Sequence, residues 1–152
     1  MDPYRAFAFP VRIVKDNPTY PLGGVVIVGE GGDYHILRNL NTDESIENAF
    51  RDNATLTGSE FPKGVTFAGA VNARGAFYGC TALECLNEGV WFGKVEHGEE
   101  MFHGCSAMTS LPSTVDFGSL KQAEGMFKGC VSLPSLPDGI VFPQLERAYE
   151  IF

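Results

Sequence analysis

The chain has 152 residues and a formal net charge of -8, from 11 Lys and Arg against 19 Asp and Glu. This acidic balance argues against a nucleic-acid-binding surface, because such surfaces neutralise phosphates with Lys and Arg. No apolar run reaches the roughly 18 residues of a membrane-spanning helix. The 18 Gly, 9 Pro and 12 Phe indicate a chain that turns often, which favours short strands or repeats over a helical bundle.

Residues 1–43 form an N-terminal segment whose pattern predicts β-structure. Residues 8–14 predict one strand, and residues 25–28 and 34–37 predict a β-hairpin around a Gly-rich turn. We expect this segment to cap the first repeat or to attach the chain to a larger particle. Asp2 and the interrupted apolar pattern that follows predict no secretory signal.

The hairpin residues also imitate a dinucleotide-binding fingerprint, since VVIV is followed by GEGG. That motif needs a third Gly or Ala for close helix packing, and Tyr34 stands there. The residues after the turn have a strand pattern, so we expect a hairpin and no nucleotide cofactor.

Residues 44–152 carry an internal repeat of 25 residues, marked by Phe77, Phe102, Phe127 and Phe152. The complete units share the frame F-x-G-C-x-x-L-x-x-L-(P)-x-x-V-x-F, with Met108 replacing the first Leu of the second unit. A fourth, degenerate copy begins at Phe50, carries two extra residues and has Asn53 in place of Cys. This spacing predicts four stacked coils, because one such unit cannot bury its apolar face alone.

Each coil is expected to contain one short strand at its (Val/Ile)-x-Phe segment. The inward positions are then Val65, Val90, Val115 and Ile140, with Phe67, Phe92, Phe117 and Phe142. Alternation places the residue between them on the opposite face, which gives the outward column Thr66, Trp91, Asp116 and Val141. Equivalent positions of neighbouring coils would lie about 4.8 Å apart.

The repeat resembles that of the BspA-like leucine-rich repeat family, whose unit carries M-F-x-x-C-x-x-L-x-x-L and a following strand. The resemblance rests on AFYGC, MFHGC and MFKGC with their downstream Leu residues, and it covers about residues 44–152. It implies a leucine-rich-repeat solenoid of short strands with short helical or 3-10 turns, preceded here by the small N-terminal β segment. It also implies a non-enzymatic recognition or display scaffold, of a kind often found on bacterial surfaces.

The cysteines and other chemically active residues predict no catalytic or metal site. Cys80, Cys105 and Cys130 share one repeat position, which explains them as small buried apolar residues. There is no CxxC pair or paired His, so we expect no metal ligand set. Cys85 falls at a turn position and is expected to be the most exposed thiol. No convergent polar group indicates catalysis, so we expect no catalytic residue, no cofactor and no enzyme activity.

The candidate protein-binding residues are the outward column and one further aromatic residue from another variable column: Trp91, Thr66, Asp116, Val141 and Tyr78. The position of Trp91, the single Trp, leaves two interpretations open. It is either a binding anchor or a ring that another part of the chain covers.

We expect the protein to be a displayed phage virion component, such as a fibre, decoration or attachment protein. The repeat is of a surface-display type, and virion proteins need no export signal. The alternative is a bacterial surface or intracellular protein-binding module. In both cases the partner is protein, by self-assembly or with another virion or surface protein, within an oligomer or larger assembly.

The C-terminal end of the stack is a further candidate contact. Phe152 is the first residue of what would be a fifth copy. An uncapped coil exposes apolar atoms and backbone polar groups. We therefore expect another subunit, a partner chain or further residues to cover this end.

Overall fold

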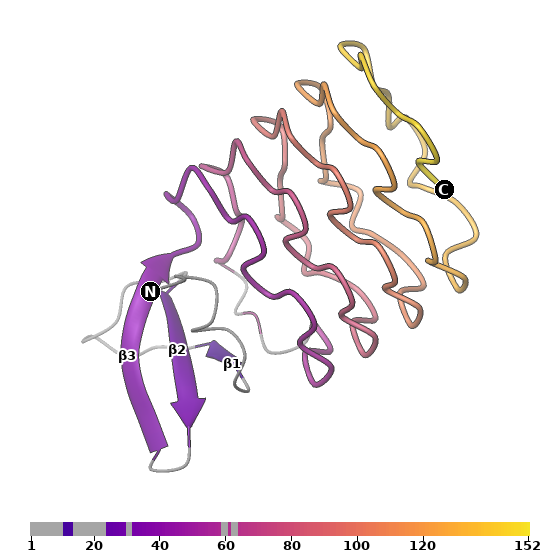
Figure 1. Ribbon diagram of the computed structural model, residues 1–152. Coiled ribbons are helices and arrows are strands. Elements are labelled where there is room, and N and C mark those ends of the chain that lie inside the picture. Colours follow the sequence, from indigo (N-terminus) through magenta and orange to yellow (C-terminus); the bar gives the residue numbers. More distant parts are fainter. Residues whose placement is uncertain (1–10, 14–23, 30–31, 59–60, 62–63) are drawn as a thin grey trace.

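The computed structural model describes residues 11–13, 24–29, 32–58, 61 and 64–152, with side chains from residue 40 onward. It shows a small antiparallel sheet followed by a stack of coils (Figure 1). The sheet lies beside the first coil, at the opposite end of the stack from the C-terminus (Figure 1). No helix occurs in these described residues.

The sheet has the order β1-β2-β3 and consists of β1 (Val11–Ile13), β2 (Gly24–Gly29) and β3 (Gly32–Asn39). Both strand pairs are antiparallel. The predicted hairpin is confirmed, since β2 and β3 pair directly, with Gly29 opposite Gly32 at the turn.

β1 covers three residues of the strand predicted at 8–14, and the other positions of that strand lie outside the described residues. A strand follows the Gly-rich turn, where a dinucleotide-binding unit would have a helix. The described residues of this segment therefore form a hairpin and no β-α unit.

The coils stack in parallel at the spacing of the sequence repeat. Single parallel bridges join, in order, Ser45, Asn72, His97, Gln122 and Arg147. Each of these residues opens a short turn-rich segment that we call a rung, and the rungs are residues 45–52, 72–79, 97–104, 122–129 and 147–152. Figure 1 shows the rungs and the returning segments as successive loops of similar shape.

The strands predicted at the (Val/Ile)-x-Phe segments are wrong, because residues 65–67, 90–92, 115–117 and 140–142 form no strand. Turns flank these segments on both sides, so each segment is too short for a ladder of β-sheet hydrogen bonds. Phe67 has a φ of 60°, a left-handed conformation that a β-strand does not contain. Parallel pairing occurs instead at the polar residue that opens each rung.

The burial predicted for the inward positions is confirmed over the first three coils. The Val and Phe residues of these coils are at most 2% exposed: Val65, Phe67, Val90, Phe92, Val115 and Phe117. In the last coil Ile140 and Phe142 are only partly buried and pack against the edge of the core.

Two columns of Phe rings form the centre of the core. In the first column, consecutive rings of Phe50, Phe77, Phe102, Phe127 and Phe152 stack with centroids 5.3 to 5.6 Å apart. The second column consists of Phe67, Phe92, Phe117 and Phe142. The columns meet edge to face, as at Phe92 and Phe102 with an interplanar angle of 70°. Both arrangements suit the ring quadrupole, so the rings fix the register of the coils.

The cysteine column explains the fixed F-x-x-C spacing. Each thiol donates a hydrogen bond to the Phe carbonyl of the preceding coil: Cys80 to Phe50 at 2.9 Å, Cys105 to Phe77 at 3.1 Å and Cys130 to Phe102 at 3.1 Å. Asn53 holds the same position in the first copy, where the frame provides no preceding Phe. Its Oδ1 accepts instead from the backbone N–H groups of Thr55 and Leu56, both at 3.2 Å.

Candidate recognition surfaces

The outward column expected from the sequence lies along one side of the stack. Thr66 and Trp91 are half-buried, and their coils are joined by a hydrogen bond from Trp91 N to Thr66 O at 2.8 Å. Asp116 is exposed, and Val141 is 64% exposed. The structure therefore brings Thr66 and Trp91 together through their backbones.

Two side chains of this column, those of Trp91 and Asp116, already contact residues of their own coil. The Trp91 ring lies against Gly93 and leaves no room there for a Cβ atom. Asp116 Oδ1 accepts from Gly118 N at 2.6 Å, as expected of an Asx turn. One face of the Trp91 ring is thus covered by its own coil, and the Asp116 carboxylate already has a backbone partner.

A shallow hollow borders the column between the last two coils. It is lined by residues 113–117 and 138–141, which include Asp116 and Val141. Thr66 and Trp91 do not line it.

Tyr78 belongs to a different surface, which we call the aromatic ridge and define as Arg51, Tyr78, His103 and Lys128. The Tyr78 and His103 rings stack with centroids 4.6 Å apart and planes within 5°. The Arg51 guanidinium carbon lies 3.9 Å from the centre of the Tyr78 ring. Arg51, Tyr78 and His103 therefore form a continuous cation-and-ring stack across neighbouring coils, and Lys128 holds the equivalent repeat position in the next coil.

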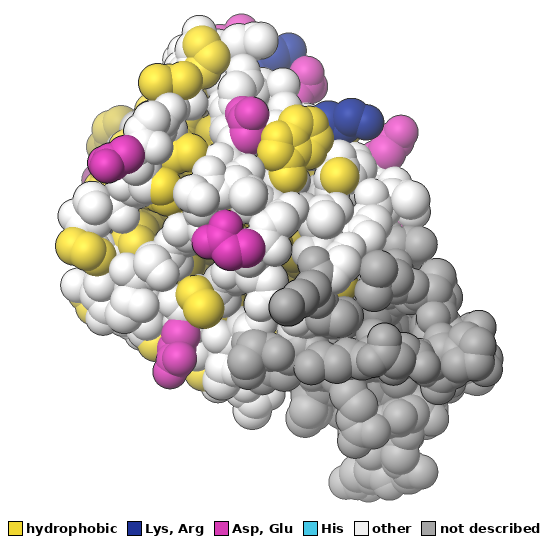
Figure 2. Space-filling view, turned by 180° about the vertical axis from the view of Figure 1, so that it is seen from behind, with side chains coloured by type: hydrophobic (Ala, Val, Ile, Leu, Met, Phe, Trp, Pro, Cys, Tyr) yellow, Lys and Arg dark blue, Asp and Glu magenta, His cyan; other side chains and the backbone are white. Residues whose placement is uncertain are grey.

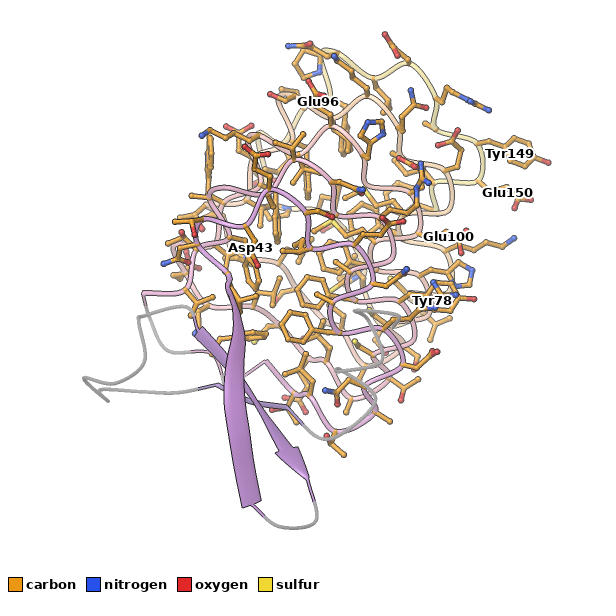
Figure 3. All side chains as sticks on the ribbon, turned by 60° about the vertical axis from the view of Figure 1, so that its left-hand side comes forward. Asp43, Tyr78, Glu96, Glu100, Tyr149 and Glu150 are labelled. Carbon is orange, nitrogen blue, oxygen red and sulfur yellow. The ribbon has the colours of Figure 1, made fainter. Side chains whose placement is uncertain are left out.

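An acidic hollow adjoins the C-terminal part of the ridge. His103 and Lys128 line it together with Glu100, Glu124, Gly125, Tyr149 and Glu150. Lys128 Nζ lies 2.6 Å from Glu150 Oε2, and the hydrogen bond from this carboxylate raises the pKa of Lys128. Figure 3 shows Tyr78, Glu100, Tyr149 and Glu150 projecting from the same side of the stack.

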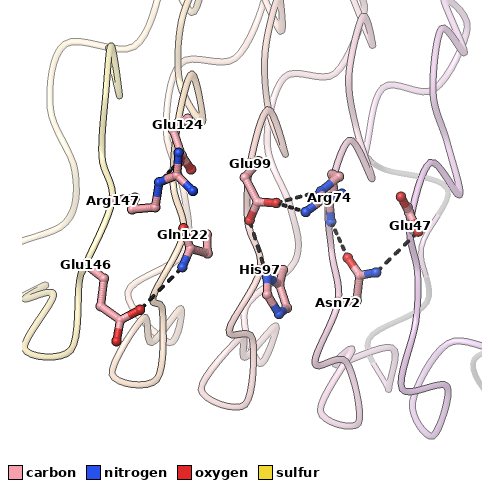
Figure 4. Close-up of polar contacts among 9 residues, drawn as sticks. All are labelled: Glu47, Asn72, Arg74, His97, Glu99, Gln122, Glu124, Glu146 and Arg147. Atoms are coloured by element: carbon pink, nitrogen blue, oxygen red, sulfur yellow. Dashed lines mark hydrogen bonds and ion pairs between the residues drawn. The ribbon is translucent and has the colours of Figure 1, made fainter.

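A row of polar side chains runs along the stack, and two ion pairs in it, Arg74–Glu99 and Arg147–Glu124, each join a coil to its neighbour (Figure 4). Arg74 donates to Glu99, whose side chain is only 14% exposed, and this carboxylate raises the pKa of Arg74. Arg147 Nε lies 2.9 Å from Glu124 Oε1 in the same way. The cations of this row are therefore already paired with carboxylates of the chain.

Each of these two carboxylates keeps one buried oxygen without a hydrogen bond. Glu99 Oε1 and Glu124 Oε2 have no hydrogen-bond partner among the described residues. His97 Nδ1 approaches Glu99 Oε1 at 3.6 Å, which is an ion-pair distance only when the ring is protonated. Both oxygens are buried, so they are not exposed to a binding partner.

The thiols of the cysteine column are unsuited to nucleophilic chemistry. Burial raises the pKa of Cys80 to about 12 and that of Cys130 to about 11, and it raises the pKa of Cys105 as well. A nucleophile must be the thiolate, so these three groups stay neutral near pH 7. Cys85 is exposed, as its turn position predicts.

Comparison with protein families, curated proteins and solved structures found no match for this chain. Within the described part of the chain, no helix is long and apolar enough to cross a membrane. The same residues contain no group of three or more His, Cys, Asp or Glu side chains that could hold a metal ion.

Sequence reasoning singled out Tyr78 but missed the rest of the ridge. Arg51, His103 and Lys128 vary in type, and they were not among the candidate binding residues. Their shared position in the repeat indicates that they lie side by side, since equivalent residues of stacked coils are neighbours. A column that combines aromatic and cationic residues could therefore have been identified as a possible cation-and-ring stack.

Proposed function

We propose that the protein is a non-catalytic protein-recognition scaffold of the BspA-like leucine-rich repeat type, with the aromatic ridge as its main binding surface. The observation that carries this proposal is the stacked arrangement of Arg51, Tyr78 and His103 on the surface. The repeat resemblance supports the class of scaffold, and the regular Phe and Cys columns support a rigid interior on which surface columns vary.

We favour the ridge over the Trp91 column because of what the side chains of each surface contact. Trp, Tyr and Arg are the residue types enriched at binding hot spots, and the ridge contains both Tyr and Arg. In the ridge they pack on one another in an extended row, with the acidic hollow beside them. In the other column, the Trp91 ring and the Asp116 carboxylate are bound to their own turns.

Partner capture with paired variants tests the binding surface. Tyr78→Ala should weaken capture of a cognate protein at least about tenfold, as expected for a residue at the centre of a hot spot. Trp91→Ala is the matched control, an aromatic truncation on the other column that should change affinity less. If Trp91→Ala abolishes capture and Tyr78→Ala does not, the outward column predicted from the sequence is the binding surface.

We further propose that this scaffold works as a displayed virion component, which is the setting that the repeat resemblance favours. Its partner would be protein, through self-assembly or with another virion or surface protein. Mass spectrometry of purified particles from the source tests this setting. Particles without the chain would refute it and would favour the alternative, a bacterial surface or intracellular binding module.

A further inference from the structure

The aromatic ridge is flanked, in the repeat frame, by two columns of left-handed residues. One column consists of Asn48, Gly75, Glu100, Gly125 and Glu150, and the other of Asp52, Gly79, Gly104 and Gly129. Five of these nine residues are Gly and carry no side chain. The side chains of the ridge therefore stand above their surroundings, and the few flanking side chains set the charge along it.

Arg51 forms a fixed, positively charged knob at one end of the ridge. Its guanidinium carbon lies 3.9 Å from the centre of the Tyr78 ring, and its Nη1 donates to Asn48 Oδ1 at 3.2 Å. Gly75 provides the space, since a Cβ atom there would lie 3.1 Å from Arg51 Nη1. The Arg51 side chain is nevertheless 42% exposed. A charged group that is already held in place loses less conformational freedom when it binds.

The acidic hollow lies at the other end of the ridge. Gly125 stands between Glu100 and Glu150 in its column, and all three residues line the hollow. The missing side chain of Gly125 thus leaves a depression between two carboxylates. The ridge therefore carries a cationic knob at one end and an acidic depression at the other.

Glu100 is the carboxylate of this hollow that is available to a partner. Lys128 Nζ lies 2.6 Å from Glu150 Oε2, and Glu124 Oε1 lies 2.9 Å from Arg147 Nε. Glu100 is exposed and has no ion pair among the residues that the structure describes. The hollow therefore has one accessible negative charge that is not neutralised by the chain.

The knob and the hollow lie on the same side of the stack, three rungs apart. Arg51 packs on Tyr78, and Figure 3 shows Tyr78 projecting from the same side as Glu100. The middle of the interval from Arg51 to Gly125 falls between the stacked rings of Tyr78 and His103. A two-fold axis at this point would set Arg51 of each copy over Gly125 of the other.

We propose that two copies of this chain pair through the aromatic ridge, with antiparallel stacks and with Arg51 of each copy in the acidic hollow of the other. The inference rests on the proposed function, because it names a second copy as a partner of the ridge. A two-fold interface uses the same patch on both copies, so one patch must contain both members of each contact. The ridge meets this condition, with Tyr78 opposite His103 at the centre.

The charges of the chain favour this orientation over others. Each copy has a net charge of -8, and Figure 2 shows acidic side chains spread over the face that it presents. Two copies therefore repel each other in most orientations. Parallel stacks would set Arg51 against Arg51 and Glu100 against Glu100. Antiparallel stacks set Arg51 against Glu100 twice.

Sedimentation velocity of the full chain, between about 1 and about 500 µM, tests the proposal. The wild type should form dimers as its concentration rises. Arg51→Glu should raise the dissociation constant at least about tenfold, because it sets two carboxylates against each other at both contacts. Glu100→Arg should do the same by setting two guanidinium groups against each other.

A mixture of these two variants is the decisive sample. In a heterodimer, the new carboxylate faces the new guanidinium at one contact, and Arg51 faces Glu100 at the other. The mixture should therefore dimerise with an affinity close to that of the wild type, although each variant alone does not. Recovery in the mixture also shows that both variants fold.

Lys94→Glu is the matched control. Lys94 is exposed in the turn that follows Trp91, so the variant makes the same change of net charge away from the ridge. It should leave the dissociation constant of the dimer unchanged.

Three results would overturn the proposal: a wild type that stays monomeric over this range, equal weakening by Lys94→Glu, or a mixture that does not dimerise. A monomeric wild type whose capture of another protein still depends on Tyr78 would leave the ridge as a recognition surface. Failure of the dimer is therefore distinguishable from failure of the proposed function.

Discussion

Truncation of one Phe ring in the middle of the stack should cost far more than the same truncation at its end. Phe102 is fully buried, and its ring stacks 5.3 Å from Phe77 and 5.6 Å from Phe127. Phe152 belongs to the same column but is 67% exposed and has one ring neighbour at 5.5 Å. The two residues therefore form a matched pair with the same chemistry and different burial.

The expected loss for Phe102→Ala is about 4 kcal/mol, within the range for deleting a buried Phe and including its two stacked partners. For Phe152→Ala the expected loss is about 1 kcal/mol, because most of the ring is already in water. Urea unfolding followed by circular dichroism measures both. The free energy of unfolding falls by about 2 kcal/mol per molar urea. The urea midpoint should therefore fall by about 2 M for Phe102→Ala and by about 0.5 M for Phe152→Ala.

Phe102→Leu keeps much of the ring volume and should lose about 1.5 kcal/mol, which provides a measurement if the alanine variant does not fold. Equal losses for Phe102→Ala and Phe152→Ala would refute the inference that the Phe column holds the coils together. A loss below about 1 kcal/mol for Phe102→Ala would refute it as well.

Three further predictions follow from the thiols and the ion pairs. In the native protein at pH 8, iodoacetamide should modify Cys85 within minutes and Cys80 only on unfolding, as mass spectrometry of digested samples can show. The raised pKa of Cys80, about 12 against 9.0, gives stability that is present below about pH 9 and lost as the pH rises towards 12. Urea midpoints at pH 8 and pH 10.5 should therefore fall more for the wild type than for Cys80→Ala. Glu99→Gln should cost less than about 1 kcal/mol, because its partner Arg74 is half-exposed, and 1 M NaCl should remove most of the difference.

The sequence predicted the columns of the core better than the backbone that carries them. A period of 25 residues places Phe92 over Phe67 whatever the local conformation, so the buried positions follow from spacing alone. The strands at the same segments were wrong, because two apolar residues with one residue between them fit a turn-flanked segment as well as a strand. The antiparallel hairpin was predictable because its strands are longer and flank a Gly-rich turn.

For the candidate surfaces, too, spacing predicted the columns of residues but not their local conformation. Spacing placed Thr66, Trp91, Asp116 and Val141 in one outward column, of which the structure leaves Thr66 and Trp91 half-buried and Asp116 and Val141 exposed. It could not show that Trp91 rests on Gly93, because that depends on a side-chain rotamer.

The left-handed residues of the rungs lay further beyond prediction, because the sequence gives little sign of them. Gly75 and Gly125 suggest such a conformation, but Glu100 and Glu150 occupy the equivalent positions with φ values of 55° and 51°. A non-Gly residue there costs of order 1 kcal/mol or more and persists only where the surrounding contacts demand it. Backbone hydrogen bonds between the rungs supply that demand, since Gly75 N donates to Glu99 O and Glu100 N donates to Glu124 O, both at 2.9 Å.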